Sequence, residues 1–362
     1  MPQVYNRRAY GCAVIKSINS NYNADFTHQP RTLPDGTVYA TDKVLKYSVR
    51  NYLNSWFAEQ RIFFFKKQNE RLVPNTLLET YNLLFGSLPK IAKPVKTKVQ
   101  ESKETQGKPG SNASDVTPGE ARRIVLSNLL SCLDIRLFGA TFAPKVTEAL
   151  GAKKKTVVDI GSDESGSEQK EESTGLNISI HGTVQITHGI NRFAEGAIFS
   201  EQIMSPFRNP EAKSYNSTMS TLGTQVRLRE GHYVHHFSVN PHNLTDHVQR
   251  AGGGATGLTT NDIEKLKEAL RSGVTFYDSA SKAGTENELL LWVELKEGSR
   301  LVLPSLVELV SVGLDREIDL TNVRALLAEP RVAEQVERIE LYYHAAGTVV
   351  RNAPEGAQVL PL

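Results

Sequence analysis

Residues that build disulfide or metal frameworks are scarce in this sequence. Its 362 residues include 2 cysteines, Cys12 and Cys132, which lie far apart without partner ligands beside them. This excludes a disulfide framework and a zinc site, so neither a metal nor another cofactor is expected, and a reducing cytoplasm is the expected location. No stretch approaches about 18 consecutive apolar residues. We therefore predict no membrane span, and we see no secretory signal.

An excess of one charge is also missing. The chain has 42 Lys and Arg against 40 Asp and Glu, a net charge of +2. Nucleic-acid-binding domains are often more basic, so the total alone does not indicate one. The charges are separated, however: residues 93–108 are rich in Lys, and residues 159–172 are rich in Asp and Glu. A locally basic face is compatible with this separation.

Strand and helix patterns alternate along the chain. Residues 8–16 predict a strand, and apolar residues after Thr41, a suitable N-cap, recur at helical spacing. Alternating apolar and polar residues predict two strands, at 176–189 and 229–242. A capping-box motif at residue 259 begins a predicted helix that extends to 270, and a last strand is predicted at 287–297. The order strand, helix, strand, strand, helix, strand predicts an α+β, ferredoxin-like fold of the kind found in RRM modules.

Two regions depart from this order. Residues 59–175 predict an inserted, mainly helical region, in which 121–143 is apolar around its circumference and is expected to be a buried helix. Segments near 93–119 and 151–175 are polar and are expected to be flexible. Residues 298–362 are predicted to be a mixed C-terminal extension, with a helix near 321–340 and a short strand near 338–344.

Three cations follow Thr41 on one helical stripe. Lys43, Lys46 and Arg50 stand at i, i+3 and i+7, about one turn apart. Such a stripe can contact a phosphodiester backbone. The alternative is a solvated helix face without a ligand.

A polar loop follows the first strand. Asn19, Asn21 and Asn23 offer donors and acceptors that could hold phosphates and riboses, although a simple surface loop has the same composition. Asp25 also permits a nuclease, because a carboxylate can bind a metal or abstract a proton. No second carboxylate accompanies it, so catalysis is not favoured.

Histidine and glycine clusters offer two further possibilities. Six of the nine histidines lie between His181 and His242, which could indicate a general base or a metal site. The neighbours His235 and His236 must point to opposite faces of a strand, so structural or RNA-contacting roles are favoured. The glycine-rich segment 251–257 has no GK[ST] sequence and is interpreted as a linker.

Residues 190–230 form a long excursion with little regular patterning. Long irregular segments of compact domains usually have a function or are disordered. Arg192, Arg227 and Arg229 could hold phosphates, while Met219 could insert between stacked bases.

Several of these segments together resemble the backbone subunit of CRISPR Cascade complexes, within the RAMP superfamily and closest to its type I-B branch. The resemblance covers residues 8 to about 297. It rests on NSNYNAD (19–25), PR (30–31), TDKVLK (41–46), RNY (50–52), DIRLFGA (134–140), HGTVQ (181–185) and VNPH (239–242). Tyr22 and Ala24 replace the proline and glycine of the Asn-Pro-Asn-Gly-Asp loop that branch members often have.

The resemblance implies a hand-like molecule. Its RRM-like palm would comprise residues 8–58, 176–190 and 229–297, its fingers 59–175 and its thumb 190–230. Copies would stack head to tail along the CRISPR RNA as a helical filament, and each thumb would kink the guide RNA of the next copy. The remaining partners would be other Cascade subunits and target DNA, which pairs with the guide.

The same resemblance implies a subunit without catalytic residues. The alternative is an endoribonuclease of this superfamily that cleaves precursor RNA through a histidine or target RNA through Asp25. A sequence-specific regulator of mRNA is less favoured, because clustered exposed aromatic residues of the RNP type are lacking.

Overall fold

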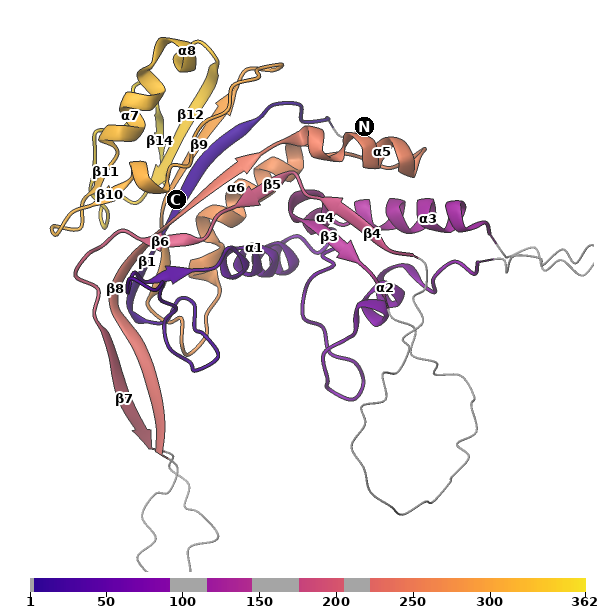
Figure 1. Cartoon of the computed structure of the whole chain (residues 1–362), viewed down its shortest axis with the longest axis horizontal. Coiled ribbons are helices and arrows are strands. Elements are labelled where there is room, and N and C mark those ends of the chain that lie inside the picture. Colours follow the sequence, from indigo (N-terminus) through magenta and orange to yellow (C-terminus); the bar gives the residue numbers. More distant parts are fainter. Residues whose placement is uncertain (1–2, 92–115, 145–175, 205–221) are drawn as a thin grey trace, which may run out of the picture.

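The computed structural model describes residues 3–91, 116–144, 176–204 and 222–362 (Figure 1). A large sheet runs through the molecule in the order β14-β12-β9-β1-β8-β6-β2, and β5 and β7 also pair with β8. Its long strands are β1 (Ala9–Ser20), β8 (Leu222–Val239), β9 (Thr285–Leu295) and β12 (Val336–Tyr343). Its short strands are β2 (Tyr39–Ala40), β5 (Val184–Ile186), β6 (Gly189–Asn191), β7 (Ile198–Met204) and β14 (Gln358–Leu360).

The central strand β1 is antiparallel to both of its neighbours, β8 and β9. Gly11 of β1 has no space for a side chain, because an added Cβ would lie 2.1 Å from the carbonyl oxygen of Leu291. When α2 to β4 and the short helices η1 and α5 are left out, the elements from β1 to β9 follow the order strand, helix, strands, strand, helix, strand, with the helices α1 (Asp42–Trp56) and α6 (Thr260–Phe276).

The two faces of the sheet support separate hydrophobic cores, since successive residues of a strand point to opposite sides. Ala13 and Ile15 of β1 pack with Leu45 of α1 and Leu266 of α6. The alternate residues of β1 pack with the C-terminal extension. That extension contains η2 (Val307–Leu309), α7 (Thr321–Ala328), α8 (Pro330–Ala333) and a small sheet of β10 (Ser311–Val312), β11 (Ile318–Asp319) and β13 (Val350–Arg351).

The prediction of a helix near 321–340 is wrong in its second half. Helix α7 ends at Ala328, α8 is a short helix that starts at Pro330, and β12 begins at Val336. Proline fits the first turn of a helix but cannot continue one, because it lacks the backbone donor.

An inserted lobe, here residues 59–91, 116–144 and 176–181, has its own core. It contains α2 (Leu77–Phe85), α3 (Pro118–Leu130), α4 (Leu133–Phe138), β3 (Gly139–Phe142) and β4 (Ile178–His181). The prediction of one helix over 121–143 is wrong. Helix α3 ends before Cys132, and Gly139, with a φ of 77°, ends α4 and begins β3.

The strand pattern of 176–189 is divided between two sheets. Strand β4 pairs with β3 in the lobe, whereas β5 pairs with β8 in the large sheet. Gly182 allows the division, since a Cβ there would lie 2.3 Å from the backbone nitrogen of Gly139. Residues 176–181 therefore belong to the lobe, although they were assigned to the palm from the sequence.

Strand β7 and the first part of β8 form a long hairpin that projects from the sheet (Figure 1). Its register runs from Ile198↔Leu228 to Met204↔Leu222. Met219 lies outside the described residues, as do 92–115 and 145–175, so the predicted flexibility near 93–119 and 151–175 stays a prediction for those residues. The end of the first segment is helical, because α3 begins at Pro118.

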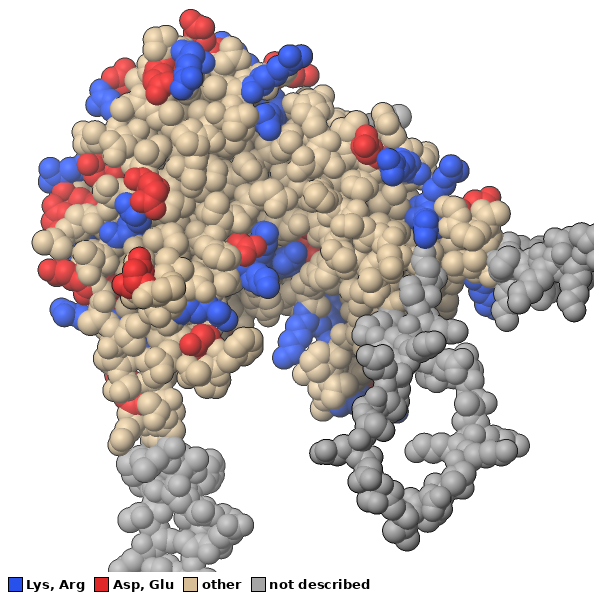
Figure 2. All heavy atoms as spheres, viewed as in Figure 1, with Lys and Arg blue, Asp and Glu red and all other residues tan. Residues whose placement is uncertain are grey.

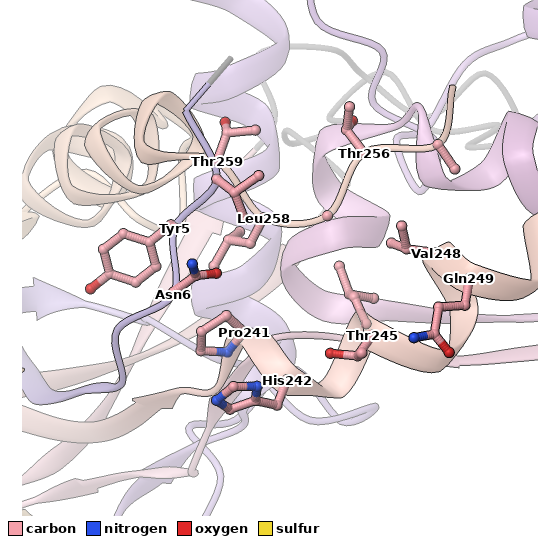
Figure 3. A pocket seen from close by; sticks show the side chains of 14 residues that line it. Tyr5, Asn6, Pro241, His242, Thr245, Val248, Gln249, Thr256, Leu258 and Thr259 are labelled. Atoms are coloured by element: carbon pink, nitrogen blue, oxygen red, sulfur yellow. The ribbon is translucent and has the colours of Figure 1, made fainter. Parts of the chain in front are cut away.

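The glycine-rich segment is more than a connection. Gly252 ends α5 (Thr245–Ala251), which follows η1 (Pro241–Leu244). Residues 255–259 then line a cavity of about 420 Å³, together with Tyr5, Asn6 and the side chains of Val248 and Gln249 (Figure 3). Its lining contains no Lys or Arg. Among the described helices, none is both long and apolar enough for a membrane crossing.

Candidate nucleic-acid interface

The molecule has a concave side between the β7–β8 hairpin and the part of the inserted lobe that contains α2. Figure 1 shows the loop after β1 and the helix α1 between these two projections. In Figure 2, Lys and Arg side chains gather along this concave margin. The predicted site residues on the loop and on α1 therefore lie on the side that a linear ligand could follow.

Asn19, predicted to lie in the loop, belongs to the end of β1, and with Arg227 it connects the start of the loop to the base of the hairpin. Asn19 is exposed and has a φ of 48°, a left-handed conformation that asparagine tolerates. Its carbonyl oxygen accepts a hydrogen bond of 2.7 Å from Nη1 of Arg227. Nη2 of Arg227 donates to Oε1 of Gln225 at 3.0 Å. Arg227 thus fixes the hairpin relative to the loop.

Asn21 and Asn23 also hold the loop in place. Asn21 is buried, and its Nδ2 donates to the carbonyl oxygen of His28 at 3.3 Å. Oδ1 of Asn23 accepts from the backbone nitrogen of Thr41 at 2.8 Å and from its hydroxyl at 3.0 Å. The side chain of Asn23 lies outside the helix and therefore provides an acceptor for the backbone N–H of Thr41 at the start of α1. These contacts support a role in positioning the loop.

Lys282 lies beneath the same loop. Its Nζ donates to the carbonyl oxygen of Tyr22, and its ammonium lies 5.4 Å from the centroid of the Tyr22 ring. Burial lowers the pKa of Lys282 to about 8, because desolvation disfavours the charged form.

The three cations of α1 lie in different surroundings. Lys43 is exposed and makes no ion pair with any described residue. Lys46 pairs with Asp42 at 2.8 Å, one turn before it. Arg50 donates from Nε to the fully buried Asp134 at 3.2 Å and lies over the ring of Phe138, 5.0 Å from its centroid. Of the three, Lys43 has the surroundings expected of a phosphate contact.

Arg50 belongs to a buried polar group rather than to a free stripe. The carboxylate of Asp134 also accepts from the backbone nitrogens of Phe63 at 2.8 Å and of Phe64 at 2.9 Å. A buried carboxylate with these partners needs a cation beside it. Arg50 supplies that cation and connects α1 to the inserted lobe.

A hollow of about 440 Å³ opens between α1 and the inserted lobe. Arg50 and Phe138 line it together with His181 and Gln185. Aromatic, amide and cationic groups on one open surface are suited to single-stranded nucleic acid. No role was predicted for Phe138 or Gln185 from the sequence. The sequence could have indicated them only through their positions in the DIRLFGA and HGTVQ segments. The pairing of β3 with β4 brings these two segments together in the fold.

The arginines of 190–230 separate in the structure. Arg192 faces the C-terminal extension, where it donates to the carbonyl oxygen of Val310 at 3.2 Å and to Glu308 at 2.8 Å. Its predicted place in the thumb is therefore wrong, since its partners belong to the opposite side of the sheet from α1. Arg229 is exposed at the hairpin base and has no ion pair within the described residues.

The three histidines of β8 are buried, whereas His181 of β4 is exposed. His235 lies on the side of α1, where its Nδ1 donates to the carbonyl oxygen of Thr187 at 3.1 Å and its Nε2 accepts from Tyr22 at 3.3 Å. Burial lowers its pKa to about 4. His236 stacks with Tyr10 on the other face. His232 lies between Glu288 and Glu230, at 2.6 and 3.4 Å.

Asp25 is engaged within its own loop. Its Oδ1 accepts from the backbone nitrogens of Thr27 at 2.8 Å and Gln29 at 3.0 Å and from the hydroxyl of Thr27 at 2.8 Å. The Thr27 hydroxyl is the first cause of a pKa below the usual range. In the described part of the chain, no group of three or more His, Cys, Asp or Glu side chains could hold a metal ion.

Residues 7–325 match the family model described as CRISPR-associated protein Cas7. The chain belongs to the Cas7 family. A solved chain described as "CRISPR RNA-guided surveillance complex, pre-nicking" has a TM-score of 0.51 and 12% identity, with 98% of this chain and 96% of that chain covered. A second, "CRISPR RNA-guided surveillance complex", has a TM-score of 0.44 and 11% identity, with 96% and 95% covered. No curated protein sequence matches.

Membership of the Cas7 family confirms the predicted role as a backbone subunit. The protein is a backbone subunit of a Cascade-type surveillance complex guided by CRISPR RNA. Its partners are accordingly the CRISPR RNA, the target DNA that pairs with the guide, further copies of the chain and other Cascade subunits. The mixed α+β architecture with a large sheet is shared with the first of the two solved chains.

Proposed function

We propose that CRISPR RNA follows the concave side, and that this Cas7 subunit binds it without cleaving it. The observation that carries the proposal is the exposure of Lys43 on α1 and of Arg229 at the base of the β7–β8 hairpin, which have no ion pairs among the described residues. Lys46, Arg50 and Arg227 are instead paired with Asp42, Asp134 and Glu201, in that order. Exposed, unpaired cations are the ones that can exchange counterions for phosphates.

The shape supports a hand-like assignment. The strand order β9-β1-β8-β6, with α1 and α6 packed on one face, is the arrangement of a ferredoxin-like, RRM-like palm. We assign the β7–β8 hairpin as the thumb and the inserted lobe as the fingers. A thumb that reaches a different surface of the next copy makes a head-to-tail contact, and such contacts build helical filaments. We also propose that the protein belongs to the type I-B branch and that it acts in the cytoplasm.

The absence of catalysis is supported by the surroundings of four of the candidate bases. Oδ1 of Asp25 already accepts three hydrogen bonds, and His232, His235 and His236 are buried in the sheet. The competing hypothesis is an endoribonuclease. Purified protein incubated with repeat RNA and with guide-matched RNA, with and without divalent metal, separates the two. Cleavage that disappears in Asp25→Ala would overturn the non-catalytic assignment.

Co-expression with a CRISPR RNA tests the binding mode. We expect a particle that contains several copies of the chain and protects the RNA at regular intervals. The double variant Lys43→Glu, Arg229→Glu should reduce RNA retention at moderate salt. Arg331→Glu on α8 is the matched control, since Arg331 is also exposed but lies in the C-terminal extension. Equal RNA retention by both variants would count against the concave path.

A further inference from the structure

The tip of the loop after β1 carries an aromatic side chain that the protein leaves in water. Phe26 is 96% exposed, the highest value among the large hydrophobic residues described. Folding buries almost none of its surface, so the ring contributes little to the stability of the free protein and is accessible to a ligand. The loop lies on the concave side, beside α1 and the hairpin (Figure 1).

The exposure of Phe26 does not come from a loose loop. Asp25 and Gln29 are connected by a backbone hydrogen bond of 2.8 Å, and Ala24 forms a bridge with Pro30. The carboxylate of Asp25 closes the turn around Phe26 by accepting from the backbone nitrogens of Thr27 and Gln29. The loop therefore presents the ring in a preformed position, which lowers the entropic cost of binding.

The tip is also fixed to the rest of the interface. The carbonyl oxygen of His28, which has a φ of 65°, accepts from Nδ2 of Asn21, and the backbone nitrogen of Arg31 donates to the carbonyl oxygen of Asn23 at 3.3 Å. Because Asn23 in turn bonds to Thr41 at the start of α1, the position of the ring is set relative to Lys43.

The chemistry around the ring fits a nucleobase better than a protein surface. The guanidinium of Arg31 lies 6.0 Å from the centroid of the Phe26 ring. Its neighbours Thr27, His28 and Gln29 are exposed and polar, so the loop tip offers one ring and no run of apolar side chains. A single aromatic ring beside a cation is the usual platform for stacking one base of a single strand.

We propose that Phe26, with Arg31 beside it, is a stacking platform for one nucleobase of the bound RNA. The inference rests on the proposed function and adds a residue-level contact to it. Stacking has no sequence preference, because every base has a π-face, so the platform suits a subunit whose guide varies. In a stack of copies, it would recur once per subunit.

The test uses the full chain assembled on a CRISPR RNA that carries the fluorescent base 2-aminopurine at one guide position at a time. Stacking quenches this base. We expect quenching at positions spaced by one subunit, its loss in Phe26→Ala, and its recovery in Phe26→Trp. RNA affinity should fall by about 5- to 150-fold per stacked base in Phe26→Ala. The slope of affinity against salt should not change, since no charge is removed.

Leu314→Ala is the control, because Leu314 is a 67% exposed apolar residue of the C-terminal extension. If Phe26→Ala keeps the wild-type quenching but lowers the number of copies per RNA, the ring contacts a neighbouring subunit and the proposal is wrong. Wild-type affinity and quenching in Phe26→Ala would overturn the inference alone. A wild-type chain that retains no RNA would overturn the proposed function and this inference with it.

Discussion

Arg136 and Asp262 form a buried ion pair between the inserted lobe and the helix α6. Two guanidinium nitrogens of Arg136 donate to the carboxylate oxygens of Asp262, at 2.7 and 3.0 Å, and both side chains are almost fully buried. The same carboxylate accepts from the backbone nitrogen of Thr259 at 3.0 Å and completes the capping box of α6. One side chain therefore both starts α6 and attaches the lobe to it.

Removal of Arg136 should destabilise the protein strongly. In Arg136→Ala, the carboxylate of Asp262 is left buried without its cation, which costs about 3–5 kcal/mol of unfolding free energy. Denaturant unfolding of the apo protein measures this loss. Arg331→Ala is the control: its ion pair with Glu329 is exposed, so a change within about 0.5 kcal/mol is expected. A loss near 1 kcal/mol in Arg136→Ala would mean that the lobe does not depend on this pair.

Lys43 and Arg50 should respond oppositely to the same substitution. Lys43→Gln is expected to leave stability unchanged, to weaken RNA binding uniformly across sequences, and to reduce the salt slope by about one. Arg50→Gln leaves Asp134 buried beside a neutral partner, so its main effect should be on stability. Titration of RNA at several salt concentrations, with unfolding curves of both variants, separates the two roles. A large salt effect in a fully stable Arg50→Gln would assign Arg50 to phosphate binding.

Asn23 should act through the start of α1. In Asn23→Ala, the backbone nitrogen of Thr41 loses its acceptor, which is expected to cost about 1 kcal/mol. Asn23→Asp keeps an acceptor at the same place and should restore most of this stability. Thermal unfolding of the two variants measures the difference. If Asn23→Ala instead loses RNA affinity at unchanged stability, the amide is a direct RNA contact.

Local signals predicted the parts of the fold that depend on neighbouring residues. Apolar periodicity located β1, α1, β8 and β9, and the Thr259–Asp262 motif forms the capping box of α6. The pairing of β3 with β4 could not be predicted, because their sequences are short and lie on either side of residues 145–175. A strand of four residues has almost no periodic signal of its own.

The prediction of the site residues was limited in a similar way, because their partners lie far away in the sequence. Helical spacing places Lys43, Lys46 and Arg50 on one stripe, but it does not show that the partner of Arg50 is Asp134, 84 residues away. Nor does it show that Arg192 faces Glu308 of the C-terminal extension. Ion pairs between distant segments depend on the fold, so exposure cannot be inferred from spacing on one element alone.

His235 should make the protein less stable in mild acid. Its pKa is lowered to about 4 by burial, whereas an unfolded histidine has a pKa near its ordinary value of 6.5. The unfolded state therefore binds more protons below about pH 6.5, and stability falls as the pH decreases from 6.5 toward 4. Between pH 7 and pH 5 this one group accounts for a loss of about 1–2 kcal/mol.

The variant His235→Gln cannot titrate in this range, so the pH dependence of its unfolding free energy should be shallower than that of the wild type. Its absolute stability is expected to drop, because the ring packs against Gly189 and Tyr22. The slope, rather than the stability at one pH, is thus the quantity to compare. His344→Gln, an exposed position, should keep the wild-type slope. An unchanged slope in His235→Gln would show that this imidazole is protonated, or remains uncharged, equally in the folded and unfolded states.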